Sequence, residues 1–246
     1  MTKLVSIISA SIGNPKFETT LASIENQTYR NIQHLIFCDG RQAAEKVAAL
    51  AERHPTVLRR DIIKMPYSVG CDRWNGHRMY GAACYLCDGE FIMFLDDDNF
   101  LDSTHIEDCL RVCERHSWAY SFRKIVDQTG LYVCNDDCES LGKWASAINP
   151  EDFFVDVNCY FLPRQLALQL SPIWYRKARE PGVPEVDRAL CRALREAAPD
   201  YESTYKYTLN YTAESTPKSV PARFFLKYNR IMLERYQGVL PWANRS

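Results

Sequence analysis

The sequence predicts an α/β fold in which a mostly parallel sheet is flanked by helices. Three observations predict it. Apolar runs typical of strands alternate with helical patterns throughout the first half of the chain. Residues 91–95 are continuously apolar, as expected for a buried central strand. This run leads directly into Asp96, Asp97 and Asp98, which places acids at the strand end where open α/β sheets bind ligands.

The remaining elements follow from hydrophobic periodicity. In the first half, strand patterns occur at residues 3–11, 32–37 and 61–65, and helical patterns around residues 17–24, 47–51, 73–87 and 105–116. The second half is mixed, with two strand-like runs in residues 118–133 around a turn at 127–130, further strands at 153–162 and 205–212, and a helix marked by Val186, Leu190 and Leu194. Pro181-Gly182-Val183-Pro184 is predicted to be a loop.

Composition excludes several classes of protein. The formal net charge of −1 produces no global field that would favour a nucleic-acid partner. No apolar run approaches the roughly 18 residues that span a bilayer, and the N-terminus resembles a first strand more than a signal peptide. We therefore expect a cytoplasmic protein with reduced cysteines. Cys84 and Cys87 fall in a predicted helix, where they would pack as small apolar residues.

The acidic triplet suggests a chemistry of its own. Adjacent carboxylates repel one another and are costly to desolvate, and a divalent cation relieves both costs. Oxygen ligands suit Mg²⁺ or Mn²⁺, usually together with substrate phosphates. The alternative is an acidic turn with no ligand, because Asp and Asn are common in turns and at helix starts.

The order of these motifs resembles the family-2 inverting glycosyltransferases of the GT-A fold, over about residues 3–212. The resemblance is carried by the loop after the first strand, the Gln-Thr-Tyr sequence that ends the first helix, the acid that ends the second strand, the helix before the acidic strand, and the acidic triplet itself. In this sequence these are Ser9-Ala10-Ser11, Gln27-Thr28-Tyr29, Asp39, Arg78-Met79-Tyr80-Gly81 and Leu95-Asp96-Asp97-Asp98-Asn99.

The resemblance implies specific roles for these residues. It implies that Asp98 and Asp96 are the acids of a DXD motif that holds Mn²⁺ or Mg²⁺ on the donor diphosphate. It implies a nucleotide-sugar site formed by Ser9, Ser11, Asp39, Arg73, Arg78, Asp96 and Asp97. The family takes its catalytic base from a Glu-Asp pair at a helix start. Here the pair is split by Val186, so that Asp187 is the expected base and Glu185 the fallback.

The acceptor side is less marked. Asp156 and Asn158 would share one face of a strand, which suits contacts with sugar hydroxyls and equally suits solvent exposure. Trp144 and Trp174 could stack on a sugar ring, although aromatic side chains more often belong to the core.

The resemblance also implies a division of the chain. We expect a single GT-A-type catalytic domain over residues 1–216, with a nucleotide-binding half at 1–116 and an acceptor half at 117–216. Residues 217–246 are basic and aromatic. Arg223, Lys227 and Arg230 fall on one helical face, and Phe225, Tyr228, Met232 and Tyr236 fall on another. Such a helix either contacts an anionic membrane surface or packs on its own domain with a solvated basic face.

The function expected from this resemblance is transfer of a sugar, with inversion, from a nucleotide-diphosphate donor to an acceptor hydroxyl. UDP is the commonest donor nucleotide in the family, and the acceptor could be a saccharide, a lipid-linked sugar or a small molecule. Three alternatives stay open. The chain could bind sugar nucleotides without catalysis, transfer nucleotidyl groups on a similar sheet, or hold structural Ca²⁺, although the EF-hand spacing is absent.

Overall fold

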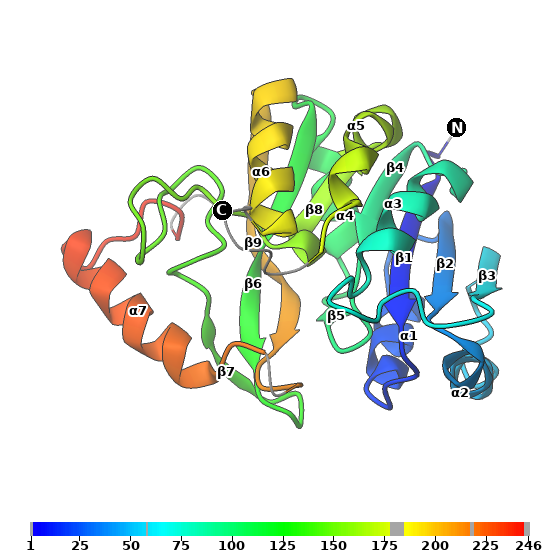
Figure 1. The fold of residues 1–246 in the computed structure, drawn as a ribbon. Helices are drawn as coiled ribbons and strands as arrows, with labels where there is room; N and C mark the ends of the chain where they lie inside the picture. The colour runs from blue at the N-terminus through cyan, green and yellow to red at the C-terminus, as the bar shows by residue number, and fades with distance from the viewer. Residues whose placement is uncertain (1, 58, 178–184, 217–218, 244–246) are drawn as a thin grey trace.

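The computed structural model describes residues 2–57, 59–177, 185–216 and 219–243. The predicted loop at residues 181–184 lies outside these ranges. Within them the chain forms one continuous sheet with helices on both sides (Figure 1).

The sheet begins with the parallel strands that the sequence predicts. β1 (Val5–Ser11) lies between β2 (Ile32–Cys38) and β4 (Phe91–Phe94), and β3 (Arg59–Lys64) pairs in parallel with β2. The carboxyl ends of β2, β1 and β4 therefore meet at the same edge of the sheet, where Ser11 lies between Asp39 and Asp96.

The second half of the chain extends the same sheet. β8 (Tyr160–Pro163) runs antiparallel to both β4 and β6 (Trp118–Val126). β6 pairs in parallel with β9 (Tyr201–Thr212), which also pairs with β5 (Phe100–Leu101). β7 (Tyr132–Asn135) forms a hairpin with β6, as the turn at residues 127–130 predicts. The fold class is therefore α/β with a mostly parallel first half, as expected.

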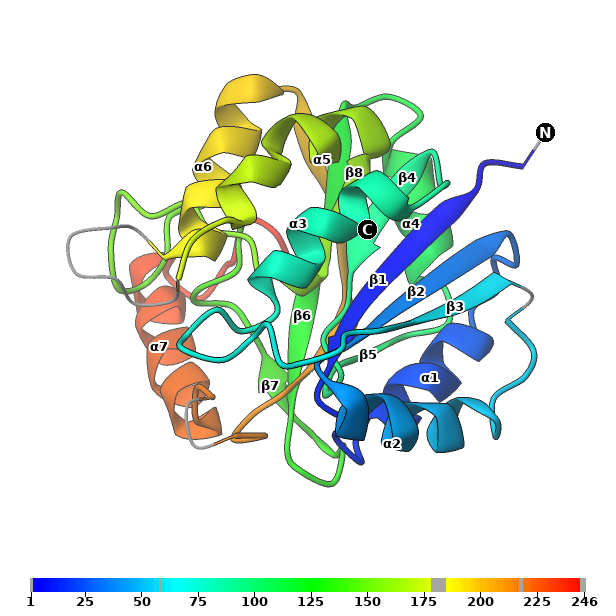
Figure 2. The same cartoon turned by 45° about the vertical axis from the view of Figure 1, so that its right-hand side comes forward.

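Helices cover both faces. α3 (His77–Leu86), α5 (Arg164–Leu170) and α6 (Val186–Ala197) lie side by side on one face (Figure 2). α1 (Phe17–Glu25) and α2 (Arg41–Ala51) pack together against the other face of β2, through Ile36 and Cys38. α4 (His105–Val112) packs on β6 and β9. Because both faces are covered, the central strands β1, β2 and β4 are buried almost along their whole length, as expected for strands inside a parallel sheet.

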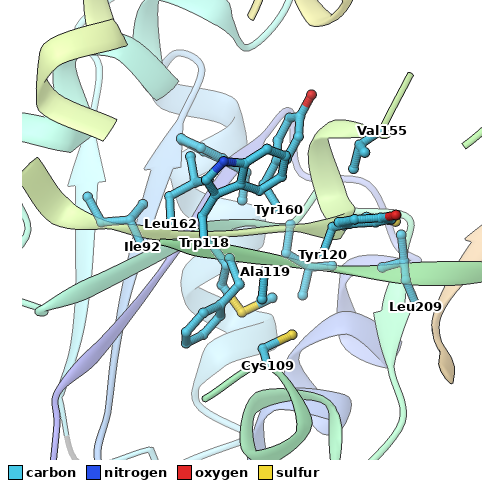
Figure 3. Packing of buried hydrophobic residues seen from close by; sticks show 14 of the residues in the cluster. Ile92, Cys109, Trp118, Ala119, Tyr120, Val155, Tyr160, Leu162 and Leu209 are labelled. Carbon is cyan, nitrogen blue, oxygen red and sulfur yellow. The ribbon is translucent and has the colours of Figure 1, made fainter. Parts of the chain in front are cut away.

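The core is built from side chains that alternate across the sheet. In Figure 3, Trp118 and Tyr160 extend to one side of the sheet, whereas Cys109 of α4 lies on the other. The Trp118 ring stacks on Tyr201 at 4.4 Å, and its Nε1 donates to the Ala198 carbonyl at 2.9 Å. A buried indole that finds such an acceptor leaves no polar atom unsatisfied. This packing fixes the start of β6 against the end of α6.

Two predicted elements begin later in the chain than expected. The strand expected over residues 153–162 begins only at Tyr160, because Asp156 caps a short 3₁₀ turn, Val157–Cys159, by accepting the Asn158 backbone N–H at 2.9 Å. The helix expected from residue 73 begins at His77. Asp72, Arg73 and Asn75 have positive φ angles, which a right-handed helix does not allow.

The C-terminal segment packs on the domain. α7 (Ala222–Arg235) buries Phe225 and Met232 and leaves its basic face exposed. Beyond it, the fully buried Trp242 donates from Nε1 to Asp137 at 2.8 Å. Of the two alternatives, packing on the domain therefore holds for the aromatic face of α7. Contact of the basic face with a membrane stays a prediction. None of the described helices is both long enough and apolar enough to cross a bilayer.

Candidate nucleotide-sugar site

A cavity of about 300 Å³ opens at the carboxyl ends of β1, β2 and β4. Its wall is formed by these strand ends, by the loop before α3 and by the first turn of α3. The lining residues are Ala10, Ser11, Ile12, Asp39, Gly70, Asn75, Gly76, Met79, Tyr80, Asp96, Asp97 and Asp98. Five residues expected at the nucleotide-sugar and metal sites are thus brought together: Ser11, Asp39, Asp96, Asp97 and Asp98.

Asp96 is held on both of its carboxylate oxygens. Oδ1 accepts a short hydrogen bond from the Tyr80 hydroxyl, and Oδ2 accepts one from Asn158 Nδ2 at 2.9 Å. The Asp96 backbone N–H donates to Asn158 Oδ1 at 2.7 Å. This carboxylate, which belongs to the cavity lining, is therefore held in one defined orientation.

Asp97 and Asp98 each bind a different part of the chain. Asp97 Oδ2 accepts from the Ser11 hydroxyl at 2.7 Å and from the Ile12 backbone N–H at 3.2 Å. Asp98 Oδ2 accepts from the Ser215 hydroxyl at 2.6 Å. Asp97 thus ties the acidic motif to the end of β1, and Asp98 ties it to the segment between β9 and α7.

Asp39 binds the loop at residues 68–70, which precedes α3 and forms part of the cavity wall. Its carboxylate accepts from the Ser68 hydroxyl at 2.8 Å and from the backbone N–H groups of Val69 at 2.6 Å and Gly70 at 3.2 Å. A Cβ atom at Gly70 would lie only 2.5 Å from the Asn75 carbonyl oxygen, so this close approach requires glycine. Asp39 therefore faces the cavity while its oxygens are bonded to this loop.

The three acids of the motif bind protons more tightly than isolated carboxyl groups do, because their pKa values are raised. Burial, reinforced by the Asp98 charge, raises the pKa of Asp96 to about 6. Burial also raises the pKa of Asp97 to about 6, with a smaller contribution from Asp96, and raises the pKa of Asp98. Burial and the same acids raise the pKa of Tyr80 well above its usual value, so this hydroxyl stays a donor. The cavity wall is thus a site where negative charge is costly.

Asp187 occupies the first turn of α6. Its Oδ1 accepts from the Arg188 backbone N–H at 2.7 Å. Burial raises the pKa of Asp187 to about 6, and the charges of Glu185 and Asp156 add to the effect. Asp156 also raises the pKa of Asp96 and of Asp98. Asp156 is therefore within electrostatic range of both the acidic motif and the expected base. Glu185 precedes the helix and is exposed.

Three residues expected at the nucleotide-sugar site do not line this cavity. Ser9 is fully buried, and its hydroxyl lies 3.1 Å from His34 Nε2 inside the sheet. Arg73 is exposed in the loop before α3. The guanidinium of Arg78 stacks at 3.7 Å over the Trp74 ring and lines a second cavity, of about 380 Å³, on the other side of α3.

The expected acceptor residues separate into two groups. Asp156 and Asn158 lie beside the acidic motif, with Asn158 bonded directly to Asp96. Trp174 is buried against Tyr80 and Phe94 and lines the second cavity. Trp144 belongs to an aromatic cluster with Trp242, 5.3 Å between ring centroids, and does not line either cavity.

Comparison with solved structures shows which fold carries this cavity. S. aureus TarS 1–349 in complex with UDP-GlcNAc superimposes with a TM-score of 0.66 at 15% identity, over 94% of this chain and 66% of that one. The mannosyltransferase PcManGT from Pyrobaculum calidifontis, in complex with GDP-Man and Mn²⁺, superimposes with a TM-score of 0.59 at 13% identity, over 99% of this chain and 78% of that one.

The chain has a GT-A-like fold. It spans slightly less than two thirds of the length of the TarS 1–349 chain. No protein-family profile and no curated protein sequence matches it. The likeness is therefore one of structure, and it agrees with the fold expected from the sequence.

Several residues that surround this cavity were not predicted from the sequence. Tyr80 and Ser215 bind the acidic motif, and Arg123 binds Asp156, which is joined to Asp96 through Asn158. Arg123 carried one recognisable signal, since it and Lys124 are charged residues inside the predominantly apolar strand β6. Ser215 carried none, because no local pattern relates it to Asp98.

The oxygen atoms of the acidic motif suit a divalent cation in their chemistry. They are hard donors whose pKa values are raised by burial and by mutual repulsion, both of which a cation relieves. Among the described residues, no three acid, cysteine or histidine side chains converge on one point as a ready ligand set. A cation held here would need oxygens from a bound ligand or from water to complete its shell.

Proposed function

We propose that this protein transfers a sugar, with inversion, from a nucleoside-diphosphate donor to an acceptor hydroxyl. The observation that carries the proposal is the position of the acidic motif. Asp96, Asp97 and Asp98 follow β4 and line a cavity with Asp39 and Ser11, in a GT-A-like fold. This is the edge of an α/β sheet where nucleotides bind. The TarS and PcManGT structures hold UDP-GlcNAc and GDP-Man, respectively, which supports a nucleotide-sugar donor.

In this proposal Ser11, Asp39, Asp96 and Asp97 bind the donor. Asp98, with Asp96, would hold Mn²⁺ or Mg²⁺, which when bound supplies charge stabilisation to a diphosphate leaving group. The Mn²⁺ in the PcManGT structure supports this assignment. UDP is the first nucleotide to test. The acceptor would be a saccharide, a lipid-linked sugar or a small molecule with a free hydroxyl.

Asp187 is the proposed base. The acceptor oxygen forms a bond to the anomeric carbon as the bond from that carbon to the diphosphate oxygen breaks, and the acceptor proton passes to Asp187. A carboxyl whose pKa is raised to about 6 is ionised at neutral pH yet more basic than an ordinary aspartate. This combination suits general-base catalysis. Glu185, which is exposed at the start of α6, is the fallback.

Calorimetric titration tests the proposal. UDP, GDP, dTDP and CMP are each titrated into the protein with and without Mn²⁺. Micromolar binding of one diphosphate only in the presence of Mn²⁺ would support the donor site and name its nucleotide. No binding by any of the four would overturn it. Binding without transfer to any acceptor would instead favour a sugar-nucleotide-binding protein that is not an enzyme.

A further inference from the structure

Arg123 is a fully buried cation that forms ion pairs with three acids, more than are needed to neutralise one positive charge. It lies on β6 with 2% of its side chain exposed. Its guanidinium contacts Asp136 from Nε at 2.7 Å, Glu139 from Nη2 at 2.7 Å and Asp156 from Nη1 at 2.5 Å. The aromatic rings of Tyr211 and Phe225 lie against it at 4.7 and 5.3 Å. All three nitrogen atoms of the guanidinium are therefore held by carboxylates.

The third of these acids connects Arg123 to the cavity. Asp156 Oδ2 binds Arg123, and Asp156 Oδ1 accepts from both the backbone N–H and the side-chain Nδ2 of Asn158, each at 2.9 Å. Because one oxygen is held by the guanidinium, the other is directed at Asn158. Asp156 is therefore a bridge between a buried cation and a neutral amide.

The amide of Asn158 has only one orientation that satisfies its surroundings. Nδ2 faces two carboxylate oxygens, Asp156 Oδ1 and Asp96 Oδ2, and Oδ1 faces the Asp96 backbone N–H. Rotating the amide by half a turn would place its oxygen against two carboxylates and its NH₂ group against an N–H donor. Asn158 therefore transmits the position of Asp156 to the carboxylate and the backbone of Asp96.

We propose that Arg123 is a positioning residue for the nucleotide site, and that it orients Asp96 through Asp156 and Asn158. The inference rests on the proposed function, since it assigns Asp96 to donor binding. Stability alone does not explain the arrangement, because apolar residues of similar volume usually stabilise a core at least as well as a buried ion-pair cluster. An ion-pair cluster does fix geometry, and here the contacts that lead from the cluster through Asn158 end at Asp96, an acid of the cavity wall.

A double-mutant cycle separates positioning from simple destabilisation. UDP affinity, in the presence of Mn²⁺, is measured for Asp156→Asn, for Asn158→Ala and for the double variant. Each single variant should weaken UDP binding at least about tenfold, as expected for loss of a hydrogen bond to a charged group. If both act through one chain of contacts, the double variant should bind within about twofold of Asn158→Ala alone, because contacting residues in one network are not additive.

Additive losses in the double variant, or unchanged affinity in either single variant, would overturn the inference. Ile24→Ala is the matched control, since Ile24 is buried in α1 and takes no part in this network. It should lower the melting temperature and leave UDP affinity unchanged. Loss of affinity in this control equal to that of Asp156→Asn would show that destabilisation alone weakens binding, and would also overturn the inference.

Arg123→Lys tests the first member of the chain. The ammonium group retains the charge but cannot form three directed contacts in one plane, so UDP affinity should again fall about tenfold. Full affinity in a folded Arg123→Lys protein would overturn the role of Arg123. Should this variant not fold, the cycle above still tests the contacts from Asp156 through Asn158 to Asp96, and its failure overturns the inference. If the unaltered protein binds no nucleotide, the proposed function fails; if it binds and the variants match it, only this inference fails.

Discussion

The hydroxyl of Ser215 donates to Asp98 Oδ2 at 2.6 Å, although the two residues are 117 positions apart in the sequence. Asp98 follows β4, and Ser215 lies just beyond β9. The contact closes one side of the acidic motif with a segment from the far half of the chain. The Asp98 side chain, which belongs to the first half of the chain, is consequently oriented by a residue of the second half.

Asp98→Ala should abolish the metal-dependent part of donor binding. Removing this carboxylate takes away the oxygen proposed to hold the cation, so affinity for UDP with Mn²⁺ should fall at least about a hundredfold, to the value without metal. Titration calorimetry measures this. Asp61→Ala, at an exposed position of β3, is the control and should bind as the unaltered protein does. Tight Mn²⁺-dependent binding by Asp98→Ala would contradict the metal assignment.

Asp187→Asn should bind the donor normally and lose transfer. The amide cannot accept the acceptor proton, and loss of a general base typically lowers kcat by about a hundredfold to ten-thousandfold. Donor titration and a transfer assay are run on the same preparation. Glu185→Gln provides the comparison, with kcat expected near the original value. The reverse result, in which only Glu185→Gln loses transfer, would make Glu185 the base.

The raised pKa of Asp187 predicts a pH dependence of stability. The carboxyl has a pKa of about 6 in the folded protein, against about 4 in an unfolded chain. Between these values the folded state binds a proton that the unfolded state does not, so this group's contribution to stability falls as pH rises from about 4 through about 6. Transfer that needs the ionised base should show the opposite trend, with kcat decreasing below about pH 6.

Comparison with Asp187→Asn isolates this group from the other carboxyls and histidines. The variant should gain stability relative to the unaltered protein by up to about 2 kcal/mol on going from about pH 4.5 to about pH 7.5, because it carries no buried charge. Urea unfolding at the two pH values measures the difference. Parallel stability profiles for the two proteins would show that Asp187 does not titrate in this range.

Trp242→Ala should destabilise the whole domain. The indole is fully buried, its Nε1 donates to Asp137, and its ring packs on Trp144. Loss of a buried tryptophan typically costs about 3 to 5 kcal/mol, which corresponds to a drop of roughly 10 °C in Tm for a chain of this length. Val239→Ala, at a residue that is 65% exposed, should change Tm little. An unchanged Tm in Trp242→Ala would mean that the C-terminal segment does not dock as described.

Hydrophobic periodicity determined most of the elements and, with them, the edge at which the site lies. Continuous apolar runs are typical of parallel strands covered on both faces, and the carboxyl ends of such strands meet at one edge. That reasoning alone places Ser11, Asp39 and Asp96 together, and in the structure all three line the same cavity. It failed for residues 153–162, where the Asp156 side chain caps a turn and delays the strand.

Only the tertiary structure decided which neighbours face the cavity. On α3, successive residues differ by about 100° in direction, so Met79 and Tyr80 line the cavity and Arg78 lies on the other side of the helix. The contacts of Asp98 with Ser215 and of Arg123 with Asp156 join residues far apart in the sequence. Local periodicity carries no information about such pairs, because their proximity arises from how β6, β9 and β4 assemble into one sheet. The sequence by itself determined the strands and the acids; assembly of the sheet decided what holds those acids in place.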